Sequence, residues 1–154
     1  MVRTVVLVRH GQAKGKKYGQ TDFDRELTKR GAAALEMTFP KTFAHVMPTR
    51  SSELWVSTAK RALQTAEIAN KTLGIRLVRE FDYLYDQDYQ SFMDELAISD
   101  ADLVVVVGHI PFMEDACAML TGSYMGFSTG AAACIEIDDA GKGSLVWFED
   151  GPEV

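Results

Sequence analysis

The sequence predicts an α/β protein, a three-layer α/β/α sandwich with a mostly parallel central sheet. Short apolar runs rich in β-branched residues alternate along the chain with segments whose apolar residues have helical spacing. The run 103–107 is aliphatic throughout, which is typical of a strand buried on both faces of a parallel sheet. The 154 residues contain no internal repeat, linker-like run or low-complexity segment, so a single domain over 1–154 is expected.

Six strands are expected, and turn residues or helical segments separate them. The first is the β-branched run "TVVLV", and the third has only partial alternation of apolar and polar residues. The last two are joined by a turn around "DDAGKG". In chain order, the expected strands are 4–8, 53–57, 75–84, 102–108, 131–138 and 143–149.

Four helices are expected between these strands, at 27–39, 58–74, 89–97 and 111–120. Thr28 is a plausible N-cap of the first helix, and Pro40 should end or kink it. The second has the clearest helical spacing and stops at Gly74. Pro111 suits the first turn of the last helix. Because helices alternate with strands, the sheet should be largely parallel.

Composition excludes several classes of partner. The formal net charge of −6 argues against a general affinity for nucleic acid or anionic membrane. The longest aliphatic run is too short to span a bilayer, and Arg9 and His10 occur before a signal-peptide core could form. Cys117 and Cys134 lie in apolar stretches without metal-ligand spacing, which favours reduced core thiols. A cytoplasmic protein is expected.

The unusual polar residues all follow strands at their carboxyl ends, where parallel sheets form their ligand crevices. His45 follows a helix instead and has no such signal. The residues that follow the first four strands are, in order, Arg9, His10 and Gly11; Arg61; Asp86 and Asp88; and Gly108 and His109. We therefore expect two of the three histidines to lie beside two arginines and some carboxylates at one edge of the sheet.

Lys60 and Arg61 occupy the first turn of their helix, where the macrodipole favours acidic residues. A bound anion would offset this unfavourable placement, and the helix N-terminal amides would point at the same anion. Lys14, Lys16 and Lys17 follow the first strand end. They could form a solvated loop or a lid that faces the substrate.

These residue types together indicate phosphoryl transfer. Two guanidinium groups suit the oxygens of a phosphoryl group, and a neutral imidazole can attack phosphorus. A second imidazole, if protonated, can stabilise the developing charge, and a carboxylic acid can protonate the leaving group. Arg9, Arg61 and His109 supply the positive charge that Mg²⁺ would otherwise bring, so no metal or cofactor is required. No Walker-type phosphate loop is present in the sequence.

Five stretches occur in the order "LVRHG" (7–11), "DFDRELTKRG" (22–31), "STAKRALQTA" (57–66), "VVGHIP" (106–111) and "FSTGAAACIEID" (127–138). Together they resemble the histidine phosphatase superfamily, also called phosphoglycerate-mutase-like, and the resemblance covers nearly the whole chain. The short chain looks most like the small phosphohistidine phosphatases of bacterial phosphorelays.

The resemblance implies that His10 is the nucleophile and that Arg9, Arg61 and His109 complete the phosphate pocket. Family members usually place a Glu in a Leu-x-Glu motif after the third strand. The corresponding stretch here is "LYD" (84–86), so Asp86 is the nearest match for the acid, ahead of Asp82 and Asp88. A weak acid signal favours a P–N or otherwise activated substrate over a sugar phosphate ester, because the imidazole of a phosphohistidine leaves readily once protonated.

The expected function is therefore a metal-independent phosphatase that acts through phospho-His10, with a phosphohistidine-containing protein domain as the preferred substrate. Two alternatives stay open. One is a phosphatase or mutase for a small phosphorylated metabolite, although a mutase would need a lid for which this chain has little sequence to spare. The other is a non-catalytic module that binds phosphorylated ligands on the same fold.

Overall fold

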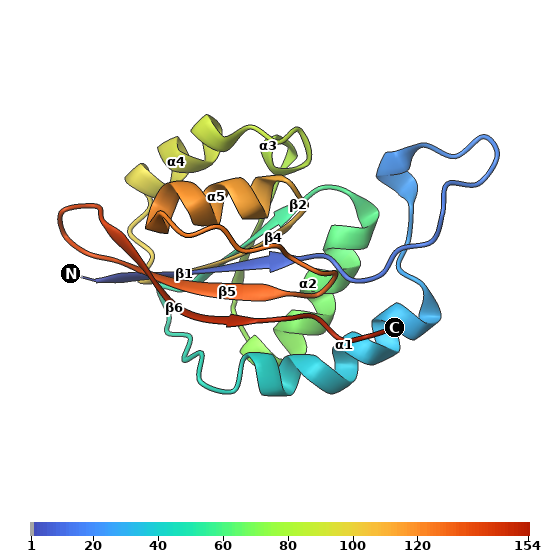
Figure 1. Ribbon diagram of the computed structural model, residues 1–154, viewed down its shortest axis with the longest axis horizontal. Coiled ribbons are helices and arrows are strands. Elements are labelled where there is room, and N and C mark those ends of the chain that lie inside the picture. Colours follow the sequence, from blue (N-terminus) through green and yellow to red (C-terminus); the bar gives the residue numbers. More distant parts are fainter. Residues whose placement is uncertain (1) are drawn as a thin grey trace.

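The computed structural model describes residues 2–154 as a six-stranded sheet with helices on both faces (Figure 1). The strands are β1 (Arg3–Arg9), β2 (Glu53–Ser57), β3 (Leu77–Phe81), β4 (Leu103–Gly108), β5 (Ala132–Ile137) and β6 (Gly143–Glu149). The helices are α1 (Lys29–Thr42), α2 (Lys60–Leu73), α3 (Asp82–Tyr85), α4 (Tyr89–Ile98) and α5 (Phe112–Thr121), and a short 3-10 helix, η1, spans Asp22–Asp24.

The strand order across the sheet is β3-β2-β4-β1-β5-β6. The first four strands in this order are parallel to one another. β5 pairs with β1 in antiparallel orientation, and β6 pairs antiparallel with β5 at the edge of the sheet. Every residue of β4 is buried, as expected for a central strand. The predicted α/β class with a mostly parallel sheet is therefore confirmed.

An apolar core lies on each face of the sheet, between the strands and the helices that cover that face. Side chains on β1 alternate between these two cores, because successive residues of a strand point to opposite faces. Val5 and Leu7 belong to the core beneath α4 and α5, and Val6 and Val8 to the core against α1 and α2. Figure 1 shows these two helix groups on opposite sides of the sheet. This is the predicted three-layer sandwich.

Helix capping follows the sequence with one exception. The Thr28 side chain accepts a hydrogen bond from the Gly31 amide at the start of α1, and Gly74 ends α2 with a φ of 65°. Pro40 does not end α1, because the helix continues to Thr42, and the alternative expectation of a kink stays a prediction. The amide that Pro40 lacks would have bonded the carbonyl of Glu36, an exposed residue, so water can bond that carbonyl instead.

The third strand is shorter than the predicted range 75–84. It ends at Phe81, which pairs with Ser57, the last residue of β2. Beyond that point β3 has no neighbour with which to continue the ladder, and the chain turns into α3. This early turn determines which side chains of 82–88 reach the neighbouring cavity.

Cys117 and Cys134 are both buried free thiols, as predicted. Among residues 2–154, no helix has the length and apolar character needed to cross a bilayer.

Candidate active site

The parallel pairing of β1 with β4 brings the two predicted histidines together. Arg9 is in register with Gly108, and the His10 amide donates to the Gly108 carbonyl at 2.9 Å. The imidazole rings of His10 and His109 have centroids 5.2 Å apart, and the two residues are 8% and 4% exposed. His45, the third histidine, is exposed on the chain after α1.

Both imidazoles line a polar cavity of about 440 Å³ at the carboxyl ends of the strands. Three guanidinium groups, one carboxylate and a phenol surround them. The lining residues are Arg9, His10, Asp22, Arg25, Arg61, Tyr85, Gln87, His109 and Ile110. The four residues predicted to hold phosphate are all among them, together with four polar residues that the sequence reasoning did not assign.

The hydrogen bond of His10 determines its tautomer. Its Nδ1 lies 2.7 Å from the Gly11 carbonyl oxygen, which can only accept, so Nδ1 carries the proton. Burial, reinforced by the charges of Arg61 and Arg9, lowers the pKa of His10 to about 4. At neutral pH the ring is therefore uncharged, and Nε2 has a free lone pair.

Gly11 allows a close approach at this point of the chain. A Cβ at Gly11 would lie 2.6 Å from Cδ1 of the buried Leu35, and the Gly11 amide donates to the Thr65 hydroxyl at 3.0 Å. Gly11 does not have a positive φ, so it is the close packing that favours glycine at this position.

His109 is oriented by a serine that the sequence reasoning did not assign. Its Nε2 lies 2.7 Å from Oγ of Ser57, the buried last residue of β2. Ser57 Oγ also accepts from the Ala59 amide, so it can donate its own proton to the imidazole. Burial, followed by the neighbouring His10 and Arg61, lowers the pKa of His109 to about 3. The free ring nitrogen, Nδ1, remains to contact a ligand.

Arg9 and Arg61 share an unusual pattern of hydrogen bonds. Nη1 of Arg9 donates to the Phe127 carbonyl at 2.9 Å, and Nη1 of Arg61 donates to the Asp22 carbonyl at 2.7 Å. The Nε atoms of both arginines are buried without a partner among residues 2–154. An unpaired buried donor costs about 1–3 kcal/mol, so two of them beside the histidines point to an anion as the missing partner.

Lys60, the neighbour of Arg61 in the first turn of α2, does not line this cavity. Its Nζ pairs with Glu26 at 2.6 Å, and Lys14 approaches the same carboxylate at 3.7 Å. Of the two helix-start cations, only Arg61 therefore serves the cavity.

Asp22 is the main residue that the sequence reasoning missed. Its carboxylate accepts from Arg25 at 2.9 Å, from Arg61 at 3.0 Å and from the Tyr85 hydroxyl at 2.9 Å. These donors, Arg25 first, lower the pKa of Asp22 to about 2 despite some opposing desolvation. The Asp22 side chain is 47% exposed, in contrast to the buried histidines. Its only signal in the sequence was its place in "DFDRELTKRG".

The structure does not bring Asp86 into the cavity. Because β3 stops at Phe81, the short helix α3 places Tyr85 among the lining residues and leaves Asp86 exposed at its C-terminal end. The other two candidates are also engaged elsewhere. Asp82 accepts from the Thr58 hydroxyl at 2.6 Å, and Asp88 caps α4.

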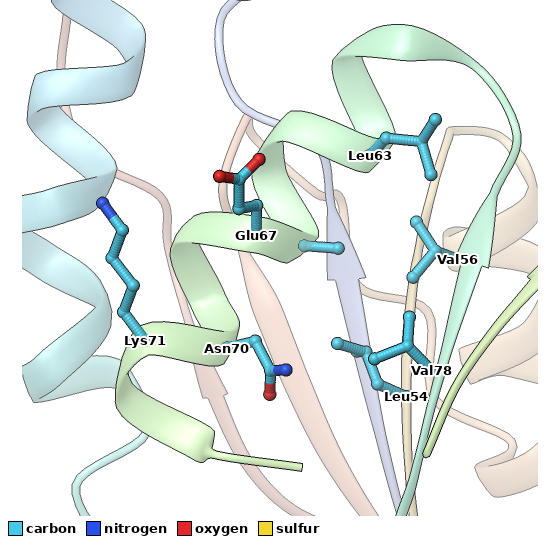
Figure 2. A pocket seen from close by; sticks show the side chains of 8 residues that line it. Leu54, Val56, Leu63, Glu67, Asn70, Lys71 and Val78 are labelled. Atoms are coloured by element: carbon cyan, nitrogen blue, oxygen red, sulfur yellow. The ribbon is translucent and has the colours of Figure 1, made fainter. Parts of the chain in front are cut away.

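A second cavity, of about 420 Å³, lies between α2 and strands β2 and β3 (Figure 2). It is lined by Leu54, Val56, Leu63, Ala66, Glu67, Asn70, Lys71 and Val78. Its lining is mostly apolar, and two of its polar groups are already paired. Asn70 bonds the backbone of Ile75, and Lys71 pairs with Glu36 at 2.6 Å. The cavity with the histidines is therefore the candidate active site.

Comparison with models of known protein families gives a match over more than half of the chain. The family model of the histidine phosphatase superfamily (branch 1) matches residues 5–95, a segment that includes Arg9, His10, Asp22 and Arg61 but ends before His109. No curated protein matches the chain by sequence.

Three solved structures are similar to the whole fold. A protein from Agrobacterium tumefaciens, assigned as the phosphohistidine phosphatase SixA, is 26% identical, with a TM-score of 0.80 over 96% of this chain and 97% of that chain. A protein with the same assignment from Nakamurella multipartita is 25% identical, with a TM-score of 0.81 over 98% and 97%. The protein histidine phosphatase SixA complexed with tungstate is 22% identical, with a TM-score of 0.74 over 96% of each chain.

Proposed function

This chain belongs to the histidine phosphatase superfamily, and on that premise we propose that it is a metal-independent phosphatase whose nucleophile is Nε2 of His10. One observation carries the proposal. The Gly11 carbonyl fixes the proton of His10 on Nδ1, and the free Nε2 belongs to a cavity that also contains the two arginines with unpaired Nε–H groups. The arrangement suits attack on a bound phosphoryl group.

The reaction has two displacements at phosphorus. In the first, the Nε2 lone pair of His10 forms a P–N bond while the bond to the leaving group breaks, and the leaving group takes up a proton. In the second, water attacks phosphorus, the P–Nε2 bond breaks and inorganic phosphate leaves. Arg9 and Arg61 hold the phosphoryl oxygens throughout, and His109 contacts the same oxygens through Nδ1. The positive charge of the two guanidinium groups is therefore already in place as the transition state forms.

The preferred substrate class is protein phosphohistidine. The two neighbours at 25% and 26% identity carry that assignment, which supports it. The cavity chemistry supports it as well. Asp22 has a pKa of about 2 and is ionised at neutral pH, so it cannot protonate an alkoxide. A phosphohistidine's imidazole leaves once it is protonated and needs less help from an enzymic acid.

The proposal also covers metal dependence and the cellular compartment. The guanidinium groups of Arg9, Arg25 and Arg61 supply the positive charge that a metal ion would otherwise bring, so activity should persist in EDTA. Both cysteines are buried free thiols, which supports action in a reducing compartment, the cytoplasm.

Labelling tests the nucleophile directly. Incubation with acetyl phosphate should introduce an acid-labile, base-stable phosphoryl group, and peptide mapping should locate it on His10. Label on another residue, or an acid-stable label, would contradict the mechanism.

A side-by-side turnover comparison tests the substrate class. The wild-type protein should hydrolyse a phosphohistidine-bearing protein domain with a higher kcat/KM than any member of a panel of phosphorylated metabolites. A clear preference for one metabolite would replace the proposed substrate class while leaving the chemistry of His10 intact. Binding of these compounds without turnover would instead indicate a non-catalytic module.

A further inference from the structure

The segment between β1 and η1 forms a loop whose base is firmly attached to the active site. The Lys14 amide donates to the Glu26 carbonyl at 2.8 Å, and Arg25 Nε donates to the Lys14 carbonyl at 2.8 Å. Arg25 also lines the catalytic cavity and pairs with Asp22. Arg25 therefore belongs both to the base of the loop and to the wall of the cavity.

The tip of the loop is ordered by its own backbone rather than by packing. The Gln20 amide donates to the Lys17 carbonyl at 2.9 Å, and the Lys17 amide donates to the Gln20 side chain at 3.0 Å. Gly19 has a φ of +77°, which this turn requires. The side chains of residues 15–19 take no part in these bonds and are exposed.

Those side chains have the composition of a binding surface. Tyr18 is fully exposed, and neither Lys16 nor Lys17 has an ion-pair partner within residues 2–154. The wider segment 9–31 contains seven Lys and Arg against three Asp and Glu, in a protein whose net charge is −6. An aromatic side chain that directly follows two unpaired cations suits contact with an acidic partner surface.

The placement of the loop selects for large substrates. Figure 1 shows it projecting away from the body beside the carboxyl end of β1 instead of folding across the strand ends. None of residues 15–19 lines the cavity. A small phosphorylated compound held by Arg9, His10 and Arg61 would not contact the tip, whereas a protein that presents a phosphorylated side chain to the cavity would.

We propose that residues 15–19, the basic loop, dock an acidic protein surface that surrounds the phosphohistidine presented to His10. This inference rests on the proposed function and extends it from the reacting group to the partner. Exposed charges of this kind act mainly by steering association, so the effect should appear in kcat/KM and in its dependence on salt. In this proposal the lysines contact the partner protein instead of closing over the cavity as a lid.

The test compares large and small substrates in matched variants. The loop variant is the double substitution Lys16→Glu/Lys17→Glu, with Tyr18→Ala as a second variant. The control is Lys41→Glu/Lys142→Glu, which makes the same charge change at exposed lysines remote from the cavity. The probes are an acidic phosphotransfer domain phosphorylated on histidine with phosphoramidate, and free N-phosphohistidine.

On the acidic domain, the loop variant should lose about tenfold in kcat/KM at low ionic strength and should show a shallower salt dependence than the control. On free N-phosphohistidine, both variants should match the wild type. Unchanged turnover of the domain by both loop variants would overturn the inference, as would an equal loss on the small substrate. Loss of binding to RNA or anionic vesicles with normal turnover of the domain would also overturn it, because it would assign the loop to another partner.

The proposed function fails in a different way. If the wild-type protein hydrolyses neither phosphohistidine probe, the substrate class itself is wrong, whereas wild-type turnover that the loop variants leave unchanged rejects only the docking surface.

Discussion

The catalytic cavity has two sides that are built differently. On the strand side, His10 and His109 follow adjacent parallel strands, are almost completely buried and are uncharged at neutral pH. On the loop side, Asp22 and Arg25 come from an irregular segment, and the Asp22 carboxylate is about half exposed and held by ion pairs. The buried, uncharged strand side suits bond making, which needs fixed geometry, whereas the exposed carboxylate of the loop side contributes to the charge that a ligand would meet.

The strand side should carry most of the rate. Replacing His10 with Ala removes the attacking nitrogen, and loss of an enzymic nucleophile typically costs at least about 10⁴-fold in kcat. We expect turnover of phosphohistidine and of p-nitrophenyl phosphate to fall to background. His45→Ala, at the exposed third histidine, is the control and should leave kcat unchanged. Turnover near the wild-type level in His10→Ala would show that the strand side does not carry the chemical step.

Arg61 connects the two sides, because it is buried beside the histidines and bonds Asp22. Arg61→Ala should lower kcat/KM by about 10²–10³-fold, the usual cost of losing a preorganised donor to transition-state charge. Arg61→Lys should recover only part of the loss, since an ammonium group cannot reproduce the planar guanidinium. Steady-state kinetics with Lys60→Ala as the control checks this. A Lys60→Ala loss of the same size would assign the effect to helix α2 rather than to the guanidinium.

Burial of the strand side should also appear in the pH dependence of stability. The unfolded chain protonates His10 near pH 6.5, but the folded protein does so only near pH 4. Unfolding therefore becomes easier as the pH falls between these values, by about 2 kcal/mol at pH 5 for this residue alone. Urea unfolding at pH 7 and pH 5 should show a smaller decrease for His10→Asn than for the wild type. An identical decrease would mean that the ring is not desolvated, and His45→Asn should keep the wild-type decrease.

On the loop side, a substitution should have a smaller effect than those above, and it should strengthen the binding of an anion instead of weakening function. Asp22→Asn removes one negative charge from the cavity while the Asp22 carbonyl still holds Arg61. Orthovanadate should bind about fivefold more tightly, because one unit charge near a polar cavity contributes on the order of 1 kcal/mol. The control is Asp24→Asn, in the same turn of η1 but outside the cavity. Weaker binding in Asp22→Asn alone would instead show that this carboxylate holds its two arginines in place for the anion.

The same contrast explains what the sequence could predict. Buried apolar runs mark the ends of β1 and β4, and the carboxyl ends of parallel strands meet at one edge of the sheet, so the sequence predicts His10 and His109 at the same edge. The structure adds that β1 and β4 are neighbours. Asp22 reaches the cavity through bonds to Arg61 and Tyr85, which lie 39 and 63 residues away in the chain. Such pairings depend on how a loop packs against helices and strands that are distant in the sequence. Neither hydrophobic periodicity nor strand order predicts that packing.

The candidate acid illustrates a third case, in which the predicted stretch reaches the cavity through a different side chain from the one expected. Resemblance placed the acid in "LYD", but the end of β3 at Phe81 turns the chain so that Tyr85 lines the cavity and Asp86 is exposed. A one-residue change of register is enough to exchange them, because neighbouring residues in a helical turn point in different directions.

The smallest effect is therefore expected for Asp86→Asn. An exposed carboxylate outside the cavity should not protonate a leaving group, so kcat should stay within about twofold of the wild type on both phosphohistidine and an alkyl phosphate. The alkyl phosphate is the sensitive probe, because its alkoxide leaving group needs a proton most.

A loss on that substrate alone would make Asp86 the acid and would show that the loop side moves when substrate binds. The control is Asp88→Asn, since Asp88 is exposed and caps α4. If neither variant loses activity, the proton comes from water or from the Tyr85 hydroxyl, which burial and Asp22 keep protonated by raising its pKa.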